Sequence, residues 1–191
     1  MIYVFLGPAG SGKDTQADLL AKILNIPVIG TGDLFRKEIA EKTKLGEEAK
    51  KYMDDGIIVP DEFVVKVLKN EIKKPEYSNG FILTGYPRKV TQIAPLDKML
   101  KELNMELTKV VHFELDEEES VKRMQTQAKE NPGKRSDTDL ESMKNRYRTM
   151  YSETIGAIVE EYGKRGEIIH VDARPSKKDI HQVVIKKLNI N

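Results

Sequence analysis

The stretch Gly7-Pro8-Ala9-Gly10-Ser11-Gly12-Lys13-Asp14-Thr15 follows the apolar run Ile2-Tyr3-Val4-Phe5-Leu6 and precedes a pattern typical of a helix. Its spacing fits a phosphate-binding loop between a buried strand and a helix. Glycines let successive backbone N–H groups converge on phosphate oxygens, and the helix N-terminus adds partial positive charge. Lys13 is expected to act near the terminal phosphates. A glycine-rich turn without a ligand is the alternative, and the strand and helix around the loop argue against it.

The residue after the lysine departs from the usual loop. Asp14 stands where a Ser or Thr is common, so we expect Thr15 to supply the hydroxyl for Mg²⁺. A bound nucleoside triphosphate with Mg²⁺ follows from this loop.

Length and composition bound the class of protein. The 191 residues predict one globular domain. Lys+Arg 32 against Asp+Glu 31 give a net charge of +1, so no global field recruits nucleic acid or an anionic membrane, and small molecules are the expected partners. With no cysteine and no apolar run near the ~20 residues of a membrane span, we expect a soluble protein of a reducing compartment, the cytoplasm.

Strand-like and helix-like segments alternate along the chain. Strands are expected at 27–29, 81–83, 109–115 and 168–171, besides the first at 2–6, and one long helix is expected from 140 to about 162. Asp116 and Glu119 predict a capping box at the start of a helix. Two short helices at 34–41 and 46–54 have too little apolar surface for a domain, which predicts a flap. The alternation implies a parallel sheet covered on both faces.

Further segments carry groups suited to phosphate chemistry. Thr31 to Arg36 holds a hydroxyl, a carboxylate and an arginine at one loop–helix junction. Gly85-Tyr86-Pro87-Arg88, with Gln92 four residues later, follows a strand, where open α/β folds bind ligands. Phosphoryl transfer between two nucleotides needs such charges to hold donor and acceptor in line. Single helical arginines are often only solvated, and none of the three histidines is expected to be catalytic. Three further arginines that could hold phosphate groups, Arg123, Arg135 and Arg146, lie on or beside the loop near residue 133.

Taken in order, these segments resemble the adenylate kinase family of nucleoside monophosphate kinases over essentially the whole chain. The resemblance also uses Met53-Asp54-Asp55-Gly56 and Val59-Pro60-Asp61-Glu62. It implies a three-layer α/β/α fold of the P-loop kinase type with a five-stranded parallel sheet. The core would comprise 1–29, 60–122 and 139–191, the NMP-binding flap 30–59, and a short lid 123–138 without a zinc-binding hairpin.

The resemblance also implies roles for single residues. The ATP side would be formed by Gly10, Ser11, Gly12, Lys13, Asp14, Thr15 and Arg123. The AMP side would be formed by Thr31, Arg36, Ile57, Ile58, Val59, Gly85, Tyr86, Pro87, Arg88, Gln92, Arg135 and Arg146. The catalytic charges would be Lys13, Arg88, Arg123, Arg135 and Arg146.

The chain departs from the family around the metal. Thr84 stands where the family usually has an aspartate that positions Mg²⁺-bound water, while Thr138 and Gln127 replace an aspartate and an arginine of the lid. Thr15 is therefore expected to serve Mg²⁺, through water with Asp33, and Asp14 is a second source of the missing charge.

The predicted reaction is MgATP + AMP ⇌ 2 ADP, with no side-chain nucleophile. Thr31 and Gln92 favour adenine, because a hydroxyl and an amide can match its Watson–Crick edge. A UMP/CMP or broad-range kinase is one alternative, and a nucleotide-switched binding module is another. The expected partners are ATP, AMP and ADP, with a monomer or a small homo-oligomer left open.

Overall fold

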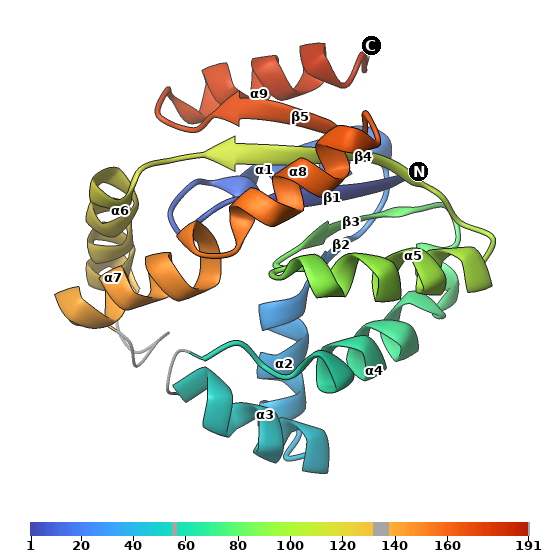
Figure 1. Ribbon diagram of the computed structural model, residues 1–191, viewed down its shortest axis with the longest axis horizontal. Coiled ribbons are helices and arrows are strands. Elements are labelled where there is room, and N and C mark those ends of the chain that lie inside the picture. Colours follow the sequence, from blue (N-terminus) through green and yellow to red (C-terminus); the bar gives the residue numbers. More distant parts are fainter. Residues whose placement is uncertain (55–56, 132–137, 191) are drawn as a thin grey trace.

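A five-stranded parallel sheet forms the centre of the protein. The computed structural model describes residues 1–54, 57–131 and 138–190. The strands β1 (Ile2–Leu6), β2 (Val28–Gly30), β3 (Phe81–Thr84), β4 (Leu107–Glu114) and β5 (Ile168–Asp172) lie in the order β2-β3-β1-β4-β5. All four pairings are parallel. The predicted parallel sheet is confirmed (Figure 1).

Helices cover both faces of this sheet because β1 is apolar on both sides. Val4 belongs to a core shared with α4 (Asp61–Ile72), α5 (Ile93–Glu102) and α8 (Ile155–Lys164). The next residue, Phe5, points to the other core, which is shared with α1 (Lys13–Leu24) and α9 (Lys177–Lys187). This alternation of neighbouring side chains gives the predicted three-layer arrangement.

The segment expected to be a flap forms two helices, α2 (Thr31–Ala40) and α3 (Lys44–Asp54), below the sheet in Figure 1. Both begin a few residues earlier than predicted. They cross closely at Gly46, where an added Cβ would lie 2.3 Å from the backbone of Glu38. Two 3-10 turns, η1 (Pro75–Tyr77) and η2 (Val90–Gln92), precede β3 and α5.

The helix α6 (Glu117–Glu130) begins as the sequence predicts. The Asp116 carboxylate accepts a hydrogen bond of 2.9 Å from the Glu119 backbone N–H, which satisfies one free donor of the first turn. Residues 123–130 of the predicted lid continue this helix. Arg135 and Asp137 lie outside the described residues.

The prediction of one long helix from 140 to 162 is wrong. The segment divides into α7 (Leu140–Tyr147), a π-helical turn η3 (Arg148–Ser152) and α8, and Figure 1 shows α7 and α8 running in different directions. Periodicity alone could not reveal the break, because Tyr147, Tyr151 and Thr154 keep the spacing of one helix across it. The Tyr151 hydroxyl contacts the ring of buried His112 on β4 at 3.0 Å, a partner far away in sequence.

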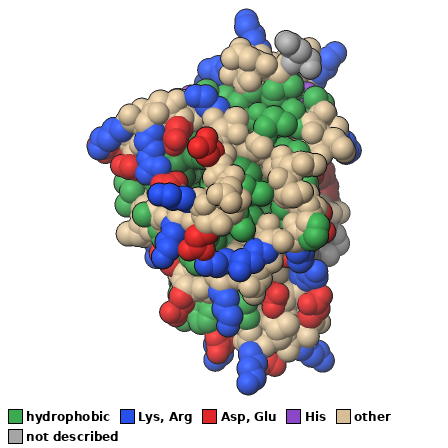
Figure 2. Space-filling model, turned by 90° about the vertical axis from the view of Figure 1, so that its right-hand side faces the viewer, with side chains coloured by type: hydrophobic (Ala, Val, Ile, Leu, Met, Phe, Trp, Pro, Cys, Tyr) green, Lys and Arg blue, Asp and Glu red, His purple; other side chains and the backbone are tan. Residues whose placement is uncertain are grey.

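Charges of both signs are interspersed on the face of the molecule in Figure 2, as the near-zero net charge leads one to expect. In the described parts of the chain, every helix is too short or too polar to cross a bilayer.

Candidate active site

The loop from Gly7 to Gly12 joins β1 to α1 and is held from the side by α6. Gly10 and Gly12 both have φ of 78°, a left-handed conformation that favours glycine. An added Cβ at Gly10 would also lie 3.0 Å from the Arg123 Cβ. The Ser120 hydroxyl donates to the Ala9 carbonyl at 2.7 Å. The loop is therefore preorganised by both its glycines and its neighbour.

Ser11 lies at the middle of this loop with an unsatisfied hydroxyl. Its side chain is fully buried, and its Oγ has no hydrogen-bond partner among the residues that the structure describes. Burying an unpaired hydroxyl costs about 1–3 kcal/mol. A phosphate oxygen in the loop would satisfy it, so the loop fits the group that the sequence predicts.

Lys13 is surrounded by charge of both signs. Its side chain is 13% exposed, and burial is the main cause that lowers the pKa of its ammonium group. Asp14, with its Oδ2 3.3 Å from Lys13 Nζ, opposes this shift, while the guanidinium charges of Arg88 and Arg146 add to it. Three cations from α1, the turn after β3 and α7 thus act on one point. A polyanion placed there would relieve their mutual repulsion.

Asp14 also reaches the end of β3. The Lys13 ammonium holds the pKa of the Asp14 carboxyl below its usual range, and the nearby Thr84 side chain lowers it further. Thr15 is exposed at the start of α1. The Asp33 Oδ1 pairs with Arg36 Nη2 at 2.5 Å. Hydroxyl and carboxylate oxygens are the ligands and water partners that Mg²⁺ prefers, so this donor set fits MgATP.

The turn after β3 meets the start of α2. The Thr31 hydroxyl donates to the Gly85 carbonyl at 2.9 Å. Gly85 has φ of 78°, and an added Cβ would lie 2.6 Å from Thr31 Oγ1. This close approach requires glycine, as the sequence pattern indicates.

Arg88 and Gln92 are fixed by bonds within the turn. Arg88 Nε donates to the Gly85 carbonyl at 2.9 Å, and the Arg88 backbone N–H donates to Gln92 Oε1 at 2.6 Å. The Gln92 amide nitrogen donates to Asp61 Oδ1 at 2.6 Å, and the side chain is buried. For the Gln92 amide to bind adenine, its hydrogen bonds to the Arg88 backbone and to Asp61 would have to break. In this state the amide shapes the turn that holds Arg88.

The other predicted acceptor residues lie around the same turn and the flap. The Tyr86 hydroxyl donates to the Gln92 carbonyl at 3.1 Å. Pro87 lines a cleft together with Lys13 and Arg88. Ile57 is 53% exposed, whereas Val59 is buried in the core. Ile58 is half-buried between them.

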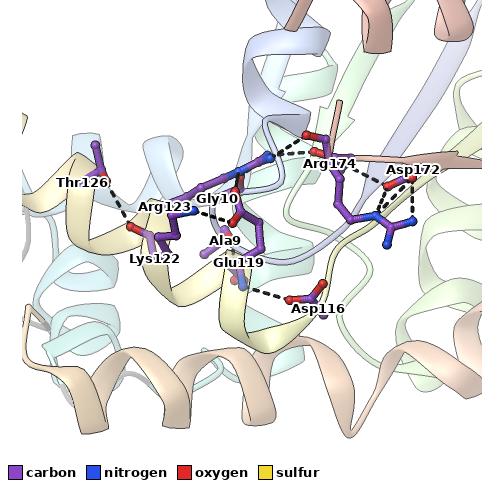
Figure 3. A network of polar contacts seen from close by, with 11 residues as sticks. Ala9, Gly10, Asp116, Glu119, Lys122, Arg123, Thr126, Asp172 and Arg174 are labelled. Carbon is purple, nitrogen blue, oxygen red and sulfur yellow. Dashed lines mark hydrogen bonds and ion pairs between the residues drawn. The ribbon is translucent and has the colours of Figure 1, made fainter. Parts of the chain in front are cut away.

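Arg123 lies beside the phosphate-binding loop (Figure 3). Its Nε pairs with Glu119 Oε1 at 2.8 Å, and its Nη1 donates to the Ala173 carbonyl at 2.8 Å and the Gly10 carbonyl at 3.4 Å. Nη2 donates to the Arg174 carbonyl at 3.1 Å. The guanidinium therefore links the loop to the segment after β5.

A cleft joins the two predicted nucleotide sides and includes residues that the sequence analysis missed. Lys13 and Arg88 line it together with Met150, Tyr151 and Thr154 from the η3–α8 segment. Arg88 Nη1 contacts Met150 Sδ at 3.3 Å. The helical pattern assigned this segment to the core, and only the break at η3 shows that it forms a cleft wall.

The structure thus brings together Lys13, Asp14, Thr84, Arg88 and Arg146, which come from four separate segments. Thr31 and Arg36 lie on α2, which follows the carboxyl end of β2 and belongs to the flap. Arg135 lies outside the described residues, and its role stays a prediction.

Comparisons with known proteins agree with this geometry. The family model for adenylate kinase matches residues 5–167. An adenylate kinase of Leptospira biflexa is 40% identical over 186 residues, which are 97% of this chain and 98% of that protein. Adenylate kinases of Corynebacterium urealyticum and Archaeoglobus fulgidus are each 36% identical, covering 99% and 96% of this chain and 99% and 94% of theirs. With a five-stranded parallel P-loop fold and matches of this extent, the chain belongs to the adenylate kinase family.

Proposed function

We propose that the protein catalyses the reversible transfer of the γ-phosphoryl group of ATP to AMP, which gives two molecules of ADP. One observation carries the proposal. The phosphate-binding loop and the Gly85–Arg88 turn follow the carboxyl ends of the paired strands β1 and β3, and the charges of Lys13, Arg88 and Arg146 act on one another there. The names of the relatives support the same reaction.

Catalysis in this proposal is positioning and electrostatic stabilisation. The loop amides and the Ser11 hydroxyl bind the donor phosphates, and Arg88 binds the acceptor phosphate. Lys13 and Arg146 then neutralise the charge of the group in transfer, which needs no side-chain nucleophile. Flap 30–59 and lid 123–138 are proposed to close over the substrates, because water in the cleft would hydrolyse ATP.

Mg²⁺ is the proposed cofactor and, when bound with ATP, neutralises phosphate charge. Thr15 is its proposed hydroxyl ligand. Asp33 and Asp14 are the carboxylates able to orient its water ligands, and Asp14 is near enough to Thr84 at the end of β3 for Thr84 to lower its pKa. Asp33 is paired with Arg36 and Asp14 with Lys13, and we propose Asp14 as the main one of the two because it lies directly beside the lysine of the phosphate-binding loop. The absence of cysteine from the sequence supports a reducing, cytoplasmic location.

AMP is the proposed acceptor, and the pyrimidine monophosphates are its competitors. The relatives' names favour AMP. The Gln92 amide already makes hydrogen bonds to the Arg88 backbone and to Asp61, so adenine must displace these bonds before it can bind the amide. A coupled assay with ATP and each of AMP, GMP, CMP and UMP measures the range. We expect the highest kcat/KM with AMP. Equal values with CMP or UMP would assign the protein to the pyrimidine or broad-range class.

The same assay tests the alternative of a nucleotide-switched binding module. A switch hydrolyses ATP slowly and does not respond to AMP, whereas the proposed kinase turns over only when AMP is present. The arginines on the acceptor side favour the kinase, because a switch needs one nucleotide site.

A further inference from the structure

Two histidines and a glutamate lie together on the face of the sheet that α8 and η3 cover. His112 and Glu114 alternate along β4 onto this face, and the register pairs His112 with His170 on β5. His112 is buried beneath Tyr151, while the Glu114 and His170 side chains are 52% and 44% exposed. The edge position of β5 leaves the group open to solvent on one side.

The ligand atoms of these side chains converge on one point. His170 Nδ1 lies 2.9 Å from Glu114 Oε1 and 3.3 Å from His112 Nδ1, and His112 Nδ1 lies 3.7 Å from the same Glu114 oxygen. Ligands bound at about 2.0–2.1 Å in a tetrahedron are separated by about 3.4 Å. The mean separation of the three atoms is close to that value, so little movement is needed to hold an ion.

We propose that His112, Glu114 and His170 form a binding site for a divalent transition-metal ion of the Zn²⁺ or Co²⁺ kind. Two imidazoles and one carboxylate suit such ions better than Mg²⁺ or Ca²⁺, which prefer oxygen ligands. The open side leaves the fourth position to water. The expectation against zinc concerned the hairpin of the lid, which this site does not use.

The hydrogen bonds of the group are compatible with metal binding. An Nδ1 has one position, which holds either a proton or a lone pair. One proton on His170 Nδ1 can serve both the Glu114 oxygen and the His112 Nδ1 lone pair. His112 Nε2 then donates to the Tyr151 hydroxyl oxygen at 3.0 Å. When a metal ion takes the place of that proton at Nδ1, the proton moves to His170 Nε2 and the imidazole stays neutral. The contact with Tyr151 orients the buried ligand as outer partners of metal-bound histidines do.

The site is separate from the proposed catalytic groups but shares a wall with them. Tyr151 contacts His112 on one side and lines the cleft with Lys13 and Arg88. An ion would tie the edge strand β5 to β4 and fix the position of Tyr151. The alternative is an ordinary His170–Glu114 ion pair without an ion.

Titration of the chelator-treated, nucleotide-free protein with Co²⁺ decides between a metal site and a simple ion pair. Visible absorption is the readout, and Zn²⁺ is then added to compete with the bound Co²⁺. We expect one ion per chain with a spectrum of low coordination number. His170→Ala and Glu114→Gln change exposed side chains and should keep the fold, which circular dichroism checks. Each should weaken binding at least ~10-fold. His181→Ala is the matched control, because His181 contacts Gln16 on the opposite face.

Thermal unfolding gives a second readout that does not depend on activity. Zn²⁺ should raise the Tm of the wild type and of His181→Ala, and should leave the Tm of His170→Ala unchanged. The proposal is overturned if the wild type binds no Co²⁺, or if His170→Ala and the wild type give the same titration curve. Either result would leave the proposed kinase function untouched.

Discussion

The carboxylate of Asp14, in the first turn of α1, lies close enough to the side chain of Thr84, the last residue of β3, for Thr84 to lower its pKa. Two positions where this chain departs from the pattern of its family are therefore neighbours in space. Lys13 lowers the pKa of the Asp14 carboxyl most and Thr84 adds to the shift, so the carboxyl stays ionised near neutral pH. A negative charge is thus present at this point, contributed by the helix instead of the strand.

The first prediction is that the charge can be moved between the two positions. Asp14→Gly should raise the Mg²⁺ concentration needed for half-maximal rate, because only Asp33, which is paired with Arg36, is then left to orient the metal's waters. Asp14→Gly combined with Thr84→Asp should restore it, and Thr84→Asp alone should gain nothing because the second carboxylate repels Asp14. Magnesium titrations at fixed ATP measure all three proteins.

Asp18→Asn is the control for this series, since Asp18 is exposed on the same helix. A double variant that needs as much Mg²⁺ as Asp14→Gly would mean that the two positions do not substitute for each other.

The second prediction is that Lys13→Met loses transfer while keeping its fold. The ammonium is expected to neutralise charge that develops during transfer, so kcat should fall more than tenfold, or about 1.4 kcal/mol. Because Arg88 and Arg146 repel Lys13, Tm should be unchanged or higher. Steady-state kinetics and thermal unfolding test both parts, and a kcat above a tenth of the wild-type value would contradict the role.

The third prediction separates the two kinds of arginine. Arg88 is held at a strand end by the Gly85 carbonyl, so it binds acceptor phosphate in the ground and transition states alike. Arg88→Ala should raise KM for AMP, whereas Arg135→Ala should mainly lower kcat. Lys89→Ala, at the exposed neighbouring position, is the control. An unchanged KM for AMP in Arg88→Ala would show that Arg88 is not the acceptor site.

The fourth prediction concerns packing within the flap. Gly46→Ala places a methyl group 2.3 Å from the backbone of Glu38, so α2 and α3 must separate at a cost of about 1–3 kcal/mol. Gly163→Ala is the matched change in α8, where an added Cβ meets nothing within 4 Å, and it should be stabilising by up to ~1 kcal/mol. Urea unfolding measures both. Equal effects of the two substitutions would refute the close crossing.

The fifth prediction is a pH dependence of stability from His112. Burial lowers the pKa of its imidazole from 6.5 to about 4, so the unfolded chain takes up its proton first as the pH falls. The contribution is complete above pH 6.5 and is lost between pH 6.5 and 4, to a total of ~3 kcal/mol. His112→Gln should reduce this slope. Urea unfolding at pH 7 and 4.5 with chelator present compares the two proteins, and parallel pH profiles would contradict the assignment.

Local patterns predicted the order and type of most elements because they depend on short-range properties. The apolar run before Gly7 predicted β1, and Asp116 predicted the start of α6. The early start of α2 at Thr31 was missed, since Thr31 is placed in the helix by its bond to Gly85 across the sheet edge. The π-helical turn at Tyr151 was missed for the same reason, because its partner His112 is 39 residues away.

The sequence by itself determined the phosphate-binding loop, the alternation of strands and helices, and the family, because glycine spacing and apolar periodicity are properties of neighbouring residues. Only the tertiary structure decided which distant side chains meet. It brought Asp14 near Thr84, engaged Gln92 within its own turn, and gathered His112, Glu114 and His170 on one face. These contacts follow from strand order and register, which set distances between segments that no local pattern specifies.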